Sequence, residues 1–71
     1  MYIVIEIQTN LDGTVGTIFY QYENLESAYS KYYSILSVAA VGELPVHTAA
    51  IMTNTGRLVE SKYFAHDVNG E

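Results

Sequence analysis

Apolar and polar positions alternate along two stretches at the start of the chain. Residues 1–8 ("MYIVIEIQ") and 15–22 ("VGTIFYQY") both have the two-residue period that is typical of a β-strand. Between them, "NLDGT" places Asn, Asp and then Gly in the order of a type I turn closed by a left-handed glycine. The pattern predicts a hairpin in which Gly13 has a positive φ and Ile5 faces Phe19.

The spacing of the apolar residues then changes to three and four, which is the spacing of one face of a helix. The residues that share this spacing are Leu25, Ala28, Tyr29, Tyr32, Ile35, Leu36, Ala39 and Ala40. Asn24 is a typical N-cap residue, and Gly42 and Pro45 are typical of a helix end. The pattern predicts one amphipathic helix between Asn24 and Gly42.

A second pair of strands is predicted after the helix, at residues 46–53 and 58–66. They are joined by the turn "NTG", which has the same chemistry as the first turn. With the same loop type, Gly56 takes a positive φ and Ile51 faces Val59.

These elements predict one small α+β domain of residues 1–66, with the order ββαββ. The compact arrangement is one four-stranded, mostly antiparallel sheet with the single helix packed on one face. If the outer strand of each hairpin lies at an edge, the strand order is 2-1-4-3, as in β-grasp domains. Residues 67–71 are polar and are predicted to form a frayed tail.

The prediction of a function starts from the two faces of this sheet, because one helix can cover only one of them. We expect the helix to cover these residues: Ile3, Ile5, Ile7, Val15, Phe19, Ala49, Ile51, Val59 and Tyr63. The uncovered face then carries an apolar, Tyr-rich patch, which is the candidate protein interface: Tyr2, Val4, Ile18, Tyr20, Tyr22, Met52 and Phe64. Exposed apolar patches usually mark interaction surfaces, and Tyr is enriched in them.

Composition adds a second reason to expect a partner. A chain of 71 residues buries little surface, and it has no cysteine with which to form a disulfide or a thiolate metal site. Its seven tyrosines supply rings with a polar tip, which suit surfaces that are covered only part of the time. We therefore expect a homo-oligomer or a complex with a partner protein.

Charge and the N-terminal segment exclude other classes of partner. The net charge of −5 argues against nucleic-acid binding, because no basic patch is available to displace counterions from phosphates. The apolar start of the chain lacks a basic segment before it and is interrupted by Glu6, so we expect neither a signal peptide nor a membrane span. The expected location is the cytoplasm.

The sequence contains few candidates for metal ligands or catalytic residues. His47 and His66 are the only histidines, and a zinc site would need a third ligand. Glu6, Glu60 and Lys62 could meet on the uncovered sheet face, but no nucleophile or histidine is expected beside them. We therefore expect no catalytic residue, no metal and no cofactor. One alternative stays open, in which two sheets pack as a dimer and enclose a pocket for a small aromatic ligand.

The segments "MYIVIEIQTN", "DGTVGT", "ESAYSKYYSILSVAAV" and "LPVHTAAIMTNTG" resemble a small uncharacterised protein family of Firmicutes bacteria and their phages and prophages. The resemblance covers most of the chain and carries over no catalytic or binding residue. It implies a phage-associated accessory protein in the host cytoplasm or in the virion. The sequence thus predicts a non-enzymatic binding or assembly module that acts through the Tyr-rich face. The alternatives are an acidic inhibitor that occludes a basic nucleic-acid-binding surface and the ligand-binding dimer.

Overall fold

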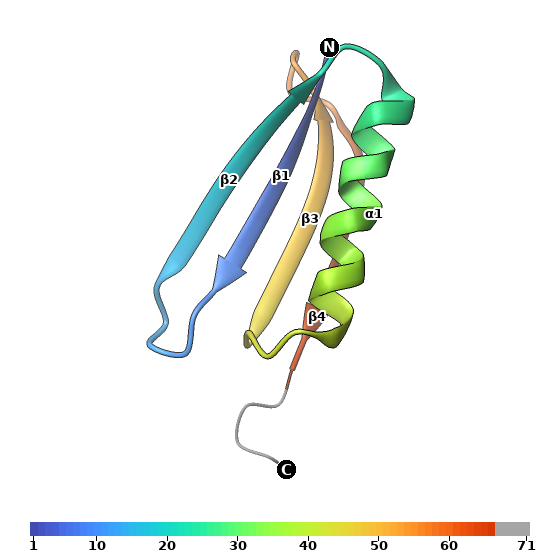
Figure 1. The fold of residues 1–71 in the computed structure, drawn as a ribbon. Helices are drawn as coiled ribbons and strands as arrows, with labels where there is room; N and C mark the ends of the chain where they lie inside the picture. Colours follow the sequence, from blue (N-terminus) through green and yellow to red (C-terminus); the bar gives the residue numbers. More distant parts are fainter. Residues whose placement is uncertain (67–71) are drawn as a thin grey trace.

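A computed structural model describes residues 1–66, which form four strands and one helix (Figure 1). The elements are β1 (Tyr2–Thr9), β2 (Val15–Tyr22), α1 (Leu25–Val41), β3 (Val46–Thr53) and β4 (Leu58–Ala65). All neighbouring strands are antiparallel within one sheet, and α1 packs on one face of it. The predicted α+β class and ββαββ order are confirmed, whereas the tail predicted at residues 67–71 lies outside the described residues.

The strands lie in the order β2-β1-β3-β4, so the predicted order 2-1-4-3 is wrong. β3 lies beside β1 in the centre of the sheet, and β4 lies at the edge. The polarity of the two strands explains this choice. β3 has no Asp, Glu, Lys or Arg, whereas β4 carries Glu60 and Lys62, and a charged side chain reaches water more easily at a sheet edge.

The first hairpin has the predicted register, with Ile5 opposite Phe19. Its loop closes with a hydrogen bond of 2.8 Å from the Asn10 N–H to the Thr14 carbonyl oxygen. Gly13 has a φ of 88°, as predicted, because the loop needs a left-handed residue at that position.

The second hairpin has the predicted glycine conformation but not the predicted register. Gly56 has a φ of 91°. An irregularity in the ladder between Ile51 and Met52 then shifts the pairing by one residue, so that Ile51 lies opposite Glu60 and not opposite Val59. Because a shift of one residue moves each side chain to the other face, the predicted sides of the β4 residues beyond this point are wrong.

The helix begins where the sequence predicts. The Asn24 side-chain oxygen accepts a hydrogen bond of 2.8 Å from the Ser27 N–H, and Gly42 forms the C-cap. The apolar stripe of α1 faces the sheet as predicted. Five of its residues are buried, Leu25 and Tyr29 are half-buried, and Ala40 at the end is exposed. The core between α1 and the sheet consists of Val4, Ala28, Tyr32, Ile35, Leu36, Ala49 and Ile51.

Candidate functional site

The core residues show which sheet face the helix covers. Val4 of β1 and Ile51 of β3 lie opposite each other and are both fully buried in the core under α1. Since successive residues of a strand point to opposite faces, Ile3, Ile5 and Ile7 lie on the face away from α1. The predicted assignment of the two faces of the first hairpin is therefore wrong.

This correction moves most of the predicted interface residues to the helix side of the sheet. Those on the helix side are Tyr2, Val4, Ile18, Tyr20, Tyr22 and Phe64. Of the predicted set, only Met52 lies on the other face, where it is opposite Ile3. A tyrosine can pack its ring under a helix and keep its hydroxyl at the rim, so a Tyr-rich face suits the core as well as an aliphatic one does. Periodicity alone could not make this distinction.

We call the sheet face away from α1 the open face. Its side chains are Ile3, Ile5, Ile7, Thr9, Val15, Thr17, Phe19, Gln21, Val46, Thr48, Ala50, Met52, Leu58, Ser61, Tyr63 and Ala65. None of them is charged, and Phe19 and Tyr63 are 64% and 63% exposed. The charged residues of the strands, Glu6, Glu60 and Lys62, all lie on the helix side. The open face is thus a broad apolar and neutral surface that nothing covers within residues 1–66.

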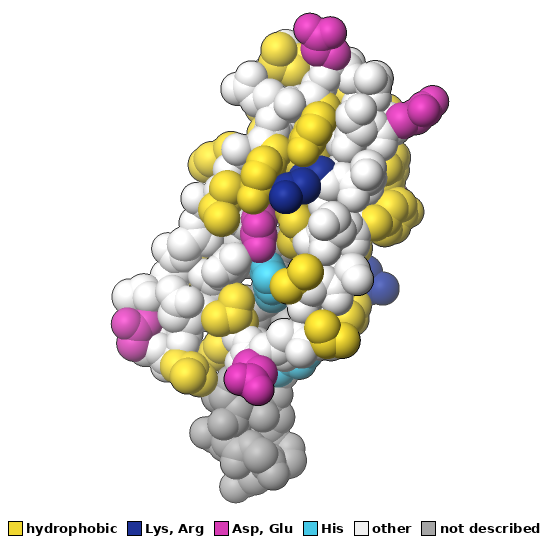
Figure 2. Space-filling view, in the orientation of Figure 1, with side chains coloured by type: hydrophobic (Ala, Val, Ile, Leu, Met, Phe, Trp, Pro, Cys, Tyr) yellow, Lys and Arg dark blue, Asp and Glu magenta, His cyan; other side chains and the backbone are white. Residues whose placement is uncertain are grey.

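A polar cluster lies between β1 and β3 on the helix side. His47 is buried, and its Nε2 lies 2.7 Å from a carboxylate oxygen of Glu6. Gln8 Nε2 donates to the same carboxylate at 2.8 Å, and the Tyr20 hydroxyl donates to it at 3.4 Å. Figure 2 shows an acidic and a histidine side chain in contact on this side of the molecule.

The surroundings of Glu6 act on its pKa in opposite directions. Burial of the carboxyl raises the pKa, but the hydrogen bonds from Gln8 and His47, the charge of His47 and the hydrogen bond from Tyr20 together lower it by more. The net result is a pKa below the ordinary value of 4.5, so the cluster favours the ionised carboxylate. The sequence prediction missed this pair because it placed β4, and not β3, beside β1, and because it placed Glu6 on the face away from the helix.

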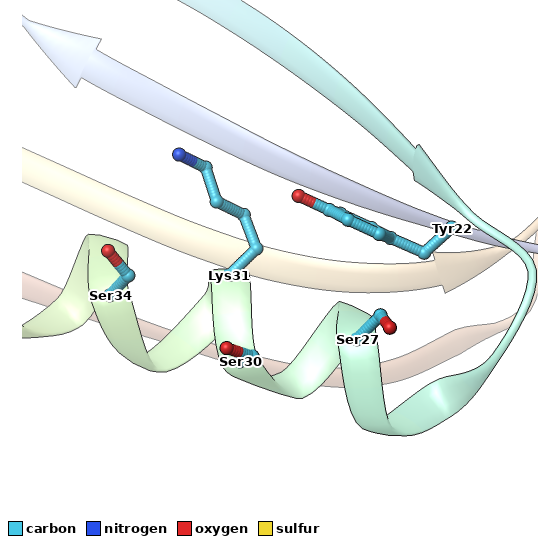
Figure 3. Close-up of a pocket in the computed structure, with 5 residues that line it drawn as sticks. All are labelled: Tyr22, Ser27, Ser30, Lys31 and Ser34. Carbon is cyan, nitrogen blue, oxygen red and sulfur yellow. The ribbon is translucent and has the colours of Figure 1, made fainter.

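A groove opens between α1 and β2 next to this cluster (Figure 3). It has a volume of about 370 Å³ and is lined by Tyr22, Ser27, Ser30, Lys31 and Ser34. The Lys31 Nζ lies 4.2 Å from the ring centre of Tyr20, which also belongs to the polar cluster. The hydroxyls and the ammonium could donate to a small anion, but Ser30 and Ser34 are exposed and the groove lacks the enclosing walls of most ligand sites.

The other titratable residues that the sequence brought to attention have structural contacts. The Glu60 carboxylate accepts a hydrogen bond of 3.1 Å from the Tyr29 hydroxyl, which ties α1 to β4. Burial, together with the nearby Glu60 carboxylate, raises the pKa of the Tyr32 phenol to about 12. His66 Nε2 donates to the Ala39 carbonyl oxygen at 2.7 Å. These contacts hold the helix on the sheet.

Within residues 1–66, no group of three or more His, Cys, Asp or Glu side chains is arranged to hold a metal ion. In the same part of the chain, α1 is neither long nor apolar enough to cross a membrane. Comparison of the chain with models of known families, with curated proteins and with solved structures found no match. The arguments for a function therefore come from the open face, the polar cluster and the groove.

Proposed function

We propose that the chain is a non-enzymatic binding module that assembles by burying its open face against the open face of a second copy. The observation that supports this is a neutral apolar surface, spread over four strands, that α1 does not cover. The rings of Phe19 and Tyr63 stand mostly in water on it. Contiguous apolar surfaces of this kind in water usually mark interaction sites, because burying them is favourable.

The distribution of charge favours a second copy as the occupant. The chain has a net charge of −5, but none of the open-face side chains carries any of it. A two-fold pair of open faces therefore brings no two like charges opposite each other. A strongly charged partner would lose hydration on such a face without gaining an ion pair.

The dimensions of the sheet set the area that a dimer could bury. Each of the four strands has eight residues. At about 3.3 Å per residue and about 4.8 Å between strands, the flat footprint is roughly 500 Å². Protruding side chains make the accessible area larger than this footprint, and stable complexes bury about 800 Å² per partner. The open face is thus close to the size that a stable dimer needs.

Two further arguments agree with this proposal. A chain of 71 residues without disulfides has little core, so burial of a second surface would add to its stability. The resemblance to a family of phage- and prophage-associated proteins supports an accessory role in an assembly rather than a metabolic reaction.

The test is a pair of Tyr→Ser variants on opposite sides of the molecule. Tyr63 lies on the open face and is 63% exposed, and Tyr33 lies on α1 and is 58% exposed. Full burial of a large apolar side chain stabilises a protein or complex by about 1.5–3 kcal/mol. Because Tyr63 is mostly exposed in a single copy, about two thirds of this stabilisation would come from dimerisation. With two such rings in a two-fold dimer, Tyr63→Ser should weaken dimerisation by roughly 30- to 1000-fold.

The dissociation constant is measured by sedimentation equilibrium, with circular dichroism to confirm that each variant is folded. Tyr33→Ser, the matched control, should leave the dissociation constant unchanged. Equal dissociation constants for Tyr63→Ser and the wild type would contradict the assignment of the open face. A wild-type chain that stays monomeric would rule out the second copy and leave a foreign protein as the occupant.

A further inference from the structure

The two edge strands of the sheet differ in how well they are protected against pairing with another strand. β4 has an irregular ladder to β3 and carries Glu60 and Lys62, which are features that discourage edge pairing. β2 pairs with β1 over its whole length without irregularity, and its sequence VGTIFYQY has no charge and no proline. No strand lies on the outer side of β2 within residues 1–66.

The ladder between β1 and β2 determines which backbone groups of β2 point outward. The Asn10 N–H donates to the Thr14 carbonyl oxygen, so this is a hydrogen-bonded pair. Hydrogen-bonded pairs recur at every second residue of an antiparallel ladder, which makes Ile18 and the other even-numbered residues of β2 the ones that bond to β1. The odd-numbered residues direct their N–H and C=O groups away from β1, to the free edge: Val15, Thr17, Phe19 and Gln21.

We propose that β2 pairs with β2 of a second copy, antiparallel and about a two-fold axis at Ile18, to form one continuous eight-stranded sheet. In this register Val15 of one copy pairs with Gln21 of the other, and Thr17 pairs with Phe19. All four outward-pointing residues of each strand are then paired through both their N–H and C=O groups. A shift of the axis to Phe19 would leave Val15 opposite Glu23, which lies beyond the end of β2.

A second copy fits this edge because the strand is complementary to itself. Since β2 carries no charge, the antiparallel pair brings no like charges together within the strands. This edge is a different surface from the open face, and the proposal does not depend on the one above. A chain that uses both surfaces has two different two-fold contacts, which build a tetramer or a longer array instead of a dimer.

Ile18 provides a test that leaves the open face unchanged. Its side chain lies on the helix side, opposite Glu6 in β1, and is 43% exposed. At the proposed axis the two Ile18 residues form a pair without hydrogen bonds, which is the arrangement in which side chains approach most closely. Ile18→Lys places two ammonium groups opposite each other, and their repulsion should weaken pairing by roughly tenfold or more. The neutral variant Ile18→Thr is the control and should change pairing much less.

Amide hydrogen exchange, measured by NMR at increasing protein concentration, shows directly whether the outward N–H groups of β2 are hydrogen-bonded. We expect the N–H groups of Val15, Thr17, Phe19 and Gln21 to become protected as the concentration rises in the wild type and in Ile18→Thr, but not in Ile18→Lys. A second variant, Thr17→Pro, removes one outward N–H without removing a bond to β1 and should also prevent this protection. Circular dichroism shows whether each variant keeps its helix.

The proposal is overturned if these four N–H groups exchange freely under conditions in which the wild type is associated. It is also overturned if the four N–H groups are protected against exchange in Ile18→Lys as strongly as in the wild type. Either result leaves the open-face proposal intact, because that proposal is tested by Tyr63→Ser. Conversely, edge protection that survives in Tyr63→Ser would support the edge contact alone.

Discussion

Replacement of Glu6 tests the account of the polar cluster in the most detail. The Glu6 carboxylate takes part in two short hydrogen bonds, with Gln8 Nε2 at 2.8 Å and with His47 Nε2 at 2.7 Å. The contact with the Tyr20 hydroxyl is longer, at 3.4 Å, and weaker. Glu6→Ala removes all three contacts, whereas Glu6→Gln keeps the shape, removes the charge and replaces one acceptor oxygen with an NH2 donor.

The size of each effect follows from the burial of His47, which is 3% exposed. A buried polar group that loses its partner costs about 1–3 kcal/mol, and a hydrogen bond to a charged group contributes about 1.5–3 kcal/mol. We therefore expect Glu6→Ala to lower the free energy of unfolding by about 2–4 kcal/mol at pH 7. Glu6→Gln should lower it by about half as much, since an amide can still bond to His47. Both values are large beside the total stability of a small domain.

The stability that Glu6 contributes should also depend on pH. The pKa of Glu6 in the folded state lies below the ordinary value of 4.5, so the folded state binds the proton less tightly than the unfolded state does. The stability that comes from ionised Glu6 is then fully present above pH 4.5 and is lost as the pH falls through the lower, folded pKa.

The assay is urea unfolding followed by circular dichroism at several values between pH 7 and pH 3. The difference in unfolding free energy between the wild type and Glu6→Gln should shrink as the pH falls from about 5 to about 3. Other acidic groups are common to both proteins and cancel in this difference. A difference that stays constant between about pH 5 and pH 3, or that grows over this range, would refute the assignment of the carboxylate.

Two further predictions concern the core and the turns. Leu36 is 8% exposed and lies in the core, so Leu36→Ala should lower the unfolding free energy by about 2–5 kcal/mol in urea titrations, whereas Val38→Ala, at a position that is 60% exposed, should have little effect. Gly56 has a φ of 91°, so Gly56→Val should lower the unfolding free energy by more than about 1 kcal/mol in the same assay. Gly16 in β2 has no positive φ, and no atom lies within 4 Å of an added Cβ, so Gly16→Val should leave the unfolding free energy unchanged or raise it.

The local elements of the fold could be predicted from the sequence because each depends on nearby residues. The N-cap at Asn24 and the left-handed glycines Gly13 and Gly56 follow from local backbone requirements, and the structure confirms all three. The register of the first hairpin could be predicted in the same way, because the turn between β1 and β2 fixes how these strands pair. In the second hairpin, an irregularity beyond the turn, at Ile51 and Met52, overrode this rule.

The features that could not be predicted depend on contacts between distant segments. Both faces of β1 are apolar enough to form a core, so periodicity could not decide whether Val4 or Ile5 would lie under α1. The charges on β4 and their absence from β3 were a usable signal for the strand order. That order brings β3 beside β1, where the observed register places Gln8 opposite His47 and brings Glu6 into contact with it.

The central claim is that the open face of one copy packs against the open face of another. The most direct measurement is an isotope-filtered NOE experiment on a mixture of labelled and unlabelled chains, which detects only contacts between copies. We predict contacts from the rings of Phe19 and Tyr63 to the methyl groups of Ile3, Ile5 and Ile7. Contacts between copies that involve only residues of α1, or no contacts at concentrations up to about 1 mM, would contradict the claim.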